Sequence, residues 1–304
     1  MSILLNKGDR VLVQGITGRE GSKAAFDMIA YGTHVVAGVT PGKGGMHVGD
    51  VPVYNTVVEA QQDFPGICAS LVTVPGAFAR AAILEAIDAR IPLIVVLAES
   101  LLIYDVAYLL ARAKENDVRI LGPSSIGLIS PGRVKIGSIG SGGIDRKVFS
   151  SGKIGVVSKS GGMTSEIAWA LTSAGFGQSS VLGIGGEVIA GSTFADIAKL
   201  FDVDNDTEAI VVFGEVGGGY EEQLAEKIVS GKIRKPVVAL IAGVFAESLG
   251  LSRGTVLGHA GAIVGEGDGS ASSKITKLQN AGVHIAYTPE DIPKILRACS
   301  KSNV

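Results

Sequence analysis

The chain has 304 residues, of which 46% are hydrophobic and 18% charged, and its formal net charge is −2. This balance argues against a basic surface for nucleic acid or anionic membranes. Apolar runs such as residues 91–98 and 209–214 are too short to span a bilayer, and the start lacks the features of a signal or transit peptide. The two cysteines, Cys68 and Cys299, lie far apart in the sequence and do not have the spacing of a metal site, so a reducing compartment is expected. We therefore expect a cytoplasmic α/β protein.

In the first half, short β-branched runs alternate with longer helical stretches. Near-continuous Val, Ile and Leu strands of this kind are typical of a parallel sheet covered on both faces. The pattern predicts strands at 10–15, 34–39, 69–74, 93–98 and 119–122, and helices at about 20–31, 56–62, 77–89 and 103–116.

A segment rich in Gly, Ser and Pro separates this half from a second series of strands and helices. We expect a first domain over residues 1–125, an inter-domain linker over 126–152 and a second domain over 153–304. Each domain is predicted to be doubly wound, with ligands at the carboxyl ends of its strands. In the second domain the pattern predicts strands at 153–158, 180–186, 209–215, 236–243 and 283–288, and helices near 162–175, 192–201, 219–230, 270–281 and 289–299.

A glycine-rich turn follows the first predicted strand, with glycines at 15, 18 and 21. Such a turn lets backbone N–H groups approach an anion at the positive end of a helix. The dinucleotide fingerprint would be G-x-G-x-x-G followed by an acid that holds a ribose, but residues 33–49 contain no carboxylate. Lys43 stands there instead and suits an added phosphate. The candidates are coenzyme A, NADP, or a plain turn with a solvated lysine.

Two further strands of the first domain end on the predicted ligand side. Thr73, Val74 and Pro75 end or follow one of them, and Glu99 follows the other. Glu99 is either part of a ligand site or an acid that stabilises the start of a helix through the helix dipole. The sequence leaves these two interpretations open.

In the second domain, strands are repeatedly followed by small residues and then a helix. At one such start, Ser160, Gly161 and Gly162 leave backbone N–H groups free for a phosphoryl group or carboxylate. The sequence contains no G-x-x-x-x-G-K-[ST] loop and no kinase signature. If phosphoryl transfer occurs here, the nucleotide must therefore be held largely by another polypeptide.

His259 stands among Gly258, Ala260, Gly261 and Ala262. A metal site would need three or four converging ligands, and no second histidine or cysteine is suitably spaced. Glu215 ends a neighbouring predicted strand and is placed to hold one ring nitrogen while the other attacks. From these residues alone, a structural histidine and a nucleophilic one remain equal alternatives.

Five motifs, taken in their order and spacing, resemble the α subunit of succinyl-CoA synthetase over residues 2–296. They are "GITGREGS" (15–22), "GVTPGKGG" (38–45), "GIGGEVIAGSTF" (183–194), "GEVGGG" (214–219) and "GHAGAI" (258–263). The resemblance implies a Rossmann-like CoA-binding domain followed by a flavodoxin-like ligase domain. It also implies a β subunit of ATP-grasp fold that binds ATP or GTP with Mg²⁺, in an αβ or α₂β₂ assembly.

The same resemblance implies roles for individual residues. His259 would be the histidine that is phosphorylated, Glu215 the acid that supports it, and Ser160, Gly161 and Gly162 the cradle for the phosphoryl group. The loops that bind CoA would include Thr17, Gly18, Arg19, Glu20, Gly21, Ser22, Pro41, Lys43, Val74, Pro75, Ala98, Glu99 and Ser124. No metal ligand is implied on this chain.

The chain departs from the family beside the CoA thiol and the acid. Residues 122–127 read "GPSSIG" where the family usually has "GPNCPG", and residues 160–166 read "SGGMTSE" in place of "SGTLTYE". These segments are more similar to ATP-citrate lyase and citryl-CoA synthetase. Succinate is therefore the first expected acid, citrate or malate the alternative, and a CoA-binding protein without turnover the alternative of another class.

Overall fold

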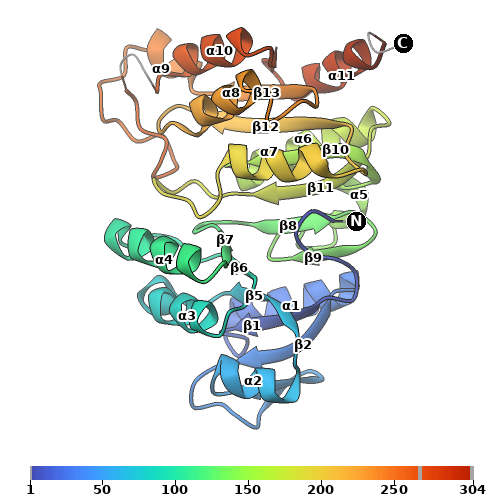
Figure 1. Cartoon of the computed structure of the whole chain (residues 1–304), viewed down its shortest axis with the longest axis vertical. Helices are drawn as coiled ribbons and strands as arrows, with labels where there is room; N and C mark the ends of the chain where they lie inside the picture. The colour runs from blue at the N-terminus through green and yellow to red at the C-terminus, as the bar shows by residue number, and fades with distance from the viewer. Residues whose placement is uncertain (1, 266–268, 302–304) are drawn as a thin grey trace.

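The computed structural model describes residues 2–265 and 269–301 and contains two sheets, each covered by helices (Figure 1). The first sheet contains β1 (Arg10–Gln14), β2 (His34–Val39), β3 (His47–Val48), β4 (Val51–Tyr54), β5 (Ile67–Val72), β6 (Leu93–Val96) and β7 (Arg119–Leu121). Its helices are α1 (Arg19–Tyr31), α2 (Val57–Asp63), α3 (Gly76–Asp88) and α4 (Ile103–Glu115).

The strands of the first sheet lie in the order β3-β4-β2-β1-β5-β6-β7. Apart from the short antiparallel β3, they are parallel and follow the order of a Rossmann fold, so the expected class of the first domain is confirmed. The strand β4 was not predicted, because "VPVY" is only four residues long and includes a proline.

The second sheet contains β8 (Gly127–Ser130), β9 (Val134–Ile136), β10 (Ser151–Ser158), β11 (Gln178–Gly183), β12 (Ala209–Glu215), β13 (Val237–Ala242) and β14 (His284–Ala286). Its parallel strands lie in the order β11-β10-β12-β13-β14, which is the flavodoxin-like order. The helices that follow along the chain are α5 (Asp145–Val148), α6 (Gly161–Ser173), α7 (Phe194–Val203), α8 (Tyr220–Val229), α9 (Val244–Ser248), α10 (Ala271–Asn280) and α11 (Asp291–Lys301).

The expected linker 126–152 is a structural part of the second domain. Its strands β8 and β9 form the antiparallel edge of the second sheet, where β8 pairs with β11. The Gly, Ser and Pro content reflects tight turns rather than a free crossing. For example, Gly127 has φ +92° and lies against the backbone of Ile136. The prediction of a linker there is therefore corrected.

The two domains pack directly against each other where α1 meets β9 (Figure 1). The N–H of Gly137 donates to Sδ of Met28, and the Thr33 hydroxyl donates to the carbonyl of Lys135 at 2.5 Å. A second contact joins segments that follow parallel strands, because the N–H of Ser100 donates to the Glu187 carboxylate at 2.8 Å. The contact between Ser100 and Glu187 brings together the segments that follow β6 and β11.

None of the helices in the described parts of the chain has the length and apolar content needed to cross a bilayer.

Candidate functional site

The centre of the candidate site is a carboxylate–imidazole pair. Glu215 is the last residue of β12, and His259 lies at the tip of a turn closed by a bridge between Val256 and Ile263. His259 Nδ1 lies 2.7 Å from Glu215 Oε2. The glutamate side chain is 7% exposed and the histidine side chain 34% exposed, so the carboxylate is fixed in the interior while the ring reaches the surface.

The hydrogen bond that the ring donates to the Glu215 carboxylate raises the pKa of His259 above its ordinary value near 6.5, although burial of the ring opposes the shift. The charge of Lys159 also lowers this pKa, and that of Glu99 raises it. The carboxylate favours the tautomer with the proton on Nδ1. Nε2 then carries the free lone pair, and no hydrogen bond to it occurs within residues 2–265 and 269–301.

Space for the imidazole comes from Gly186, which the sequence did not single out. A Cβ atom on Gly186 would lie 2.5 Å from His259 Cγ, so no other residue fits without moving the ring. The N–H of Gly261 donates to the Gly186 carbonyl at 2.9 Å and ties the two segments together. The small neighbours of His259 do not make this space. Gly258 provides the positive φ of +84° that the turn requires, and Ala262 packs in the interior. The signal for Gly186 was present in "GIGG" (183–186), which begins at the last residue of β11 and continues into the loop after it.

If His259 is the phosphorylated histidine that the family resemblance implies, Gly186→Ala is expected to slow its phosphorylation by roughly tenfold to a hundredfold, because displacement of a reacting group by about 1 Å has an effect of that size. The matched control is Gly219→Ala, since a Cβ atom on Gly219 would meet no other atom within 4 Å and the residue has no positive φ. The measurement is the initial rate of phosphoryl incorporation. Equal rates for both variants would contradict the steric role of Gly186.

The start of α6 is the second component of the site. Ser160 is its N-cap and accepts a hydrogen bond from the N–H of Met163, while the Thr164 hydroxyl donates to the Ser160 carbonyl at 2.6 Å. The N–H groups of Gly161 and Gly162 belong to the first turn and have no intrahelical acceptor. Lys159, the residue before the cap, lowers the pKa of His259 through its positive charge.

A cavity of about 800 Å³ lies at the carboxyl end of the first sheet. The predicted residues Thr17, Gly18, Pro41, Val74 and Pro75 line it. The N-cap of α1 is Gly18, which has no side chain to cap the helix, so the first N–H groups of α1 are open to an anion. The cavity therefore combines an apolar wall with a helix N-terminus.

The glycines of the first turn have distinct roles in this cavity. Gly15 has φ +85°, which the turn requires. Gly21 lies so close to the carbonyl of Gly15 that a side chain there would clash with it. This contact lets α1 approach the sheet closely.

Four other residues that were predicted to bind CoA do not line this cavity. Arg19, Glu20 and Ser22 lie on the first turn of α1, and Lys43 is exposed on its loop. Asn55 was missed by the sequence analysis. Its Oδ1 accepts from the N–H groups of both Gly42 and Gly44, at 2.9 and 3.0 Å, and so orders the Lys43 loop.

Ala98, Glu99 and Ser124 lie apart from the cavity, at the junction between the domains. The Ser124 hydroxyl donates to the Glu99 carboxylate at 3.3 Å, and Glu99 acts electrostatically on His259. Because α4 begins only at Ile103, Glu99 lies outside the first turn of that helix, which disfavours its interpretation as a helix-dipole acid. Ser124 has φ +56°, a strained conformation of the kind that is found at functional sites.

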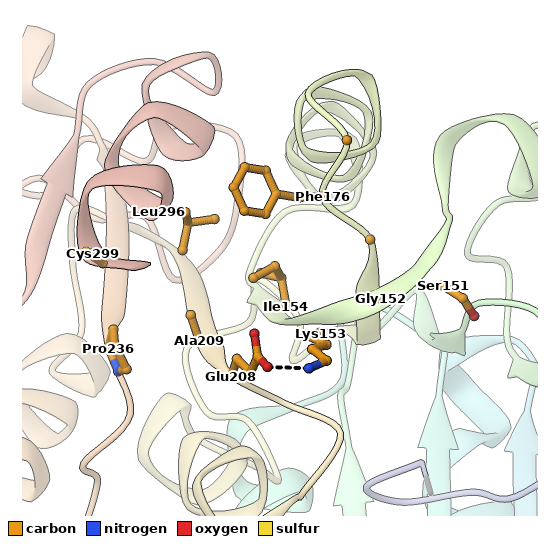
Figure 2. Close-up of a pocket in the computed structure, with 12 residues that line it drawn as sticks. Ser151, Gly152, Lys153, Ile154, Phe176, Glu208, Ala209, Pro236, Leu296 and Cys299 are labelled. Carbon is orange, nitrogen blue, oxygen red and sulfur yellow. Dashed lines mark hydrogen bonds and ion pairs between the residues drawn. The ribbon is translucent and has the colours of Figure 1, made fainter. Parts of the chain in front are cut away.

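A separate hollow of about 570 Å³ lies at the amino-terminal ends of the strands of the second sheet, whereas Glu215 lies at a carboxyl end (Figure 2). Its charged side chains, Lys153 and Glu208, pair with each other, as Figure 2 shows. Phe176 and Leu296 contribute apolar walls. This hollow contains none of the residues predicted to act in the site.

Comparison with known proteins agrees with the two α/β domains of the fold. The family model of a CoA binding domain matches residues 6–100, and that of a CoA-ligase domain matches residues 157–284. The chain is 44% identical to the succinate–CoA ligase [ADP-forming] subunit alpha of Aquifex aeolicus, over 98% of this chain and 95% of the relative. It is 45% identical to subunit alpha 1 of the same enzyme from Archaeoglobus fulgidus, over 98% of each chain.

Among solved structures, an ATP citrate lyase from Methanosaeta concilii in complex with (3S)-citryl-CoA superposes with a TM-score of 0.90 at 23% identity. The match covers 99% of this chain and 51% of the lyase chain, and at this identity it establishes the fold alone. A CoA-binding domain followed by a CoA-ligase domain defines the class as a subunit of a CoA ligase. Within that class, the chain belongs to the family of succinate–CoA ligase α subunits.

Proposed function

We propose that this chain is the α subunit of an acid–CoA ligase and that His259 carries a phosphoryl group from a nucleotide to the acid. The observation that supports this most directly is the 2.7 Å contact between Glu215 Oε2 and His259 Nδ1. A ring nitrogen held by a carboxylate leaves the other nitrogen oriented for attack, which is the usual arrangement of an activated histidine.

The proposed reaction has three balanced steps. First, Nε2 of His259 attacks the γ-phosphorus of the nucleoside triphosphate, and the bond to the bridging oxygen breaks, so that the diphosphate leaves. Next, a carboxylate oxygen of the acid attacks that phosphorus, the P–N bond breaks and an acyl phosphate forms. Finally, the CoA sulfur, having lost its proton, attacks the acyl carbon, and the C–O bond breaks to release phosphate and the thioester.

In this scheme the described residues bind, orient and stabilise. Glu215 holds the Nδ1 proton and stabilises positive charge on the ring as phosphorus binds Nε2. The free N–H groups of Gly161 and Gly162, with the positive end of α6, stabilise the phosphoryl oxygens. The cavity that includes Thr17, Gly18 and Pro41 is proposed to bind CoA, with Lys43 available to its phosphates.

The nucleotide is proposed to bind on a partner, a β subunit of ATP-grasp fold that also holds Mg²⁺. Support comes from the relatives, which are named as alpha subunits, and from the sequence, which has no G-x-x-x-x-G-K-[ST] loop and no kinase signature. The assembly is proposed to be an αβ unit or its α₂β₂ dimer. The exposure of the His259 ring is consistent with a donor that approaches from outside the chain.

Succinate is the proposed acid, because the relatives that match nearly the whole chain are named for it. Citrate and malate are the alternatives, since "GPSSIG" (122–127) departs from the usual family sequence. The deciding measurement is CoA consumption by the αβ complex with a panel of these acids. A preference for citrate or malate would replace succinate and leave the histidine mechanism intact.

The function is tested by incubation of the αβ complex with γ-labelled ATP or GTP. We expect an acid-labile, base-stable label on this chain that is discharged by the acid together with CoA. A complex that binds CoA but takes up no label from either nucleotide would favour a CoA-binding protein without turnover.

A further inference from the structure

A buried ionic cluster lies directly behind Glu215, and none of its members has a role in the reaction described above. It consists of Lys159, Glu221, Glu222 and Lys274. The side chains of Glu221 and Lys274 are 0% exposed, and that of Lys159 is 3% exposed. Charges buried to this extent are costly, so each must be matched by close partners.

Lys274, in the first turn of α10, donates hydrogen bonds to the turn that follows β12 and to the first turn of α8. Its Nζ donates to Glu221 Oε2 at 2.5 Å, to Glu222 Oε2 at 2.9 Å and to the carbonyl of Gly218 at 3.0 Å. An ammonium group has three donors, and all three are used here. The lysine therefore joins α10 to both the 217–219 turn and the start of α8.

The Glu221 carboxylate connects Lys274 to the backbone of Glu215. Its Oε2 binds Lys274, while its Oε1 accepts a hydrogen bond from the backbone N–H of Glu215 at 3.1 Å and lies 3.5 Å from Lys159 Nζ. Gly214 makes room for this carboxylate, because a Cβ atom there would lie 2.5 Å from Glu221 Oε1. The backbone position of Glu215 is thus set by a residue that lies six positions further along the chain.

The same turn also contacts the histidine loop. The N–H of Gly217 donates to the carbonyl of Gly269 at 2.9 Å, and a side chain on Gly217 would clash with the carbonyl of Gly261. The end of β12, the loop that carries His259 and the start of α10 are therefore fastened together at one place. The ion pair between Lys274 and Glu221 is the charged contact among these three segments.

We propose that Glu221 and Lys274 are positioning residues that hold the Glu215 carboxylate in line with Nδ1 of His259. This inference rests on the proposed function of His259 as a phosphoryl carrier, but it concerns two residues that touch neither the ring nor any substrate.

The charges that face His259 allow positioning to be distinguished from simple electrostatics. They are Glu215 at the end of β12, Lys159 between β10 and α6, and Glu99 after β6. If Lys274 acted only through its positive charge, its removal would raise the pKa of His259. If Lys274 positions Glu215, its removal weakens the hydrogen bond that holds this pKa high, and the pKa falls. The two roles predict opposite signs.

The test is the rate of His259 phosphorylation as a function of pH in the αβ complex, for Lys274→Met. We expect a rate roughly tenfold to a hundredfold below wild type. We also expect the midpoint of the pH profile to move down by at least roughly half a unit. The matched control is Lys135→Met, which removes another buried lysine, one that lies on β9 and pairs with Asp145 at 3.3 Å. This control is expected to lose stability but to keep the wild-type midpoint.

Glu221→Gln is the second variant, because it keeps the shape of the side chain if Lys274→Met does not fold. It is expected to slow phosphorylation, and the rate is its deciding readout, because loss of the negative charge of Glu221 would by itself also lower the midpoint. A wild-type rate and midpoint in either folded variant, or a raised midpoint in Lys274→Met, would overturn the positioning role. Absence of label on the wild-type complex would instead refute the proposed function, so the two failures are distinguishable.

Discussion

Replacement of His259 by asparagine is expected to abolish phosphorylation of the chain and to reduce thioester formation by at least about 10⁴-fold, the range observed when a nucleophile is removed. Asparagine can still meet the Glu215 carboxylate through its amide, but its nitrogen lone pair is delocalised into the carbonyl and is not nucleophilic. Retention of label by this variant would place the phosphoryl carrier elsewhere.

The matched control for this variant is His284→Asn. His284 is exposed at the start of β14, on a different strand from the site. It is expected to keep the wild-type rate of label incorporation and of CoA consumption. Thermal unfolding of both variants will separate loss of chemistry from loss of fold.

Glu215→Gln is expected to give the second largest effect, a fall of about 10²-fold or more in the rate of phosphorylation. A carboxylate that orients a histidine can contribute up to about 10⁴-fold to catalysis, because a neutral amide permits the wrong tautomer. An amide N–H that donates to Nδ1 would force the ring proton onto Nε2, where it blocks attack.

In this variant the midpoint of the rate–pH profile is expected to move to lower pH. In the wild type only the ring with a free Nε2 can attack, so the rate rises with pH through a pKa that lies above 6.5. The hydrogen bond that the ring donates to Glu215 is the largest cause of that raised pKa, and its loss moves the midpoint to lower pH. Glu208→Gln, which alters a carboxylate at the far edge of the sheet, serves as control and is expected to retain the wild-type profile. An unchanged midpoint in Glu215→Gln would contradict the assigned pairing.

The parallel strands and longer helices were predictable from sequence because each buries a continuous apolar face. Runs such as "RVLVQ" and "AIVVFGE" are recognisable by composition, and they form β1 and β12. The edge strands β8 and β9 were not predictable in this way. They are three or four residues long and lie between glycine turns, so the place of β8 beside β11 depends on contacts between segments remote in sequence.

The kinds of residue in the candidate site were also accessible from sequence. A histidine among small residues, an acid at a strand end and glycines at helix starts indicate phosphoryl chemistry, because each supplies a group that this chemistry needs. Residue types alone did not decide between a structural and a nucleophilic His259. That choice depends on whether Glu215, 44 positions away, reaches the ring.

Local composition and periodicity were enough to predict two doubly wound α/β domains and the glycine-rich helix starts, whereas the roles of individual residues were predicted only through the resemblance to a family. The three-dimensional packing was needed to establish that Glu215 meets Nδ1 of His259, that Gly186 makes room for the ring, and that Lys274 and Glu221 restrain the turn behind them. Each of these is a distance between segments remote in sequence. Such distances are set by the packing of whole strands and helices and by the cost of leaving a buried charge unpaired.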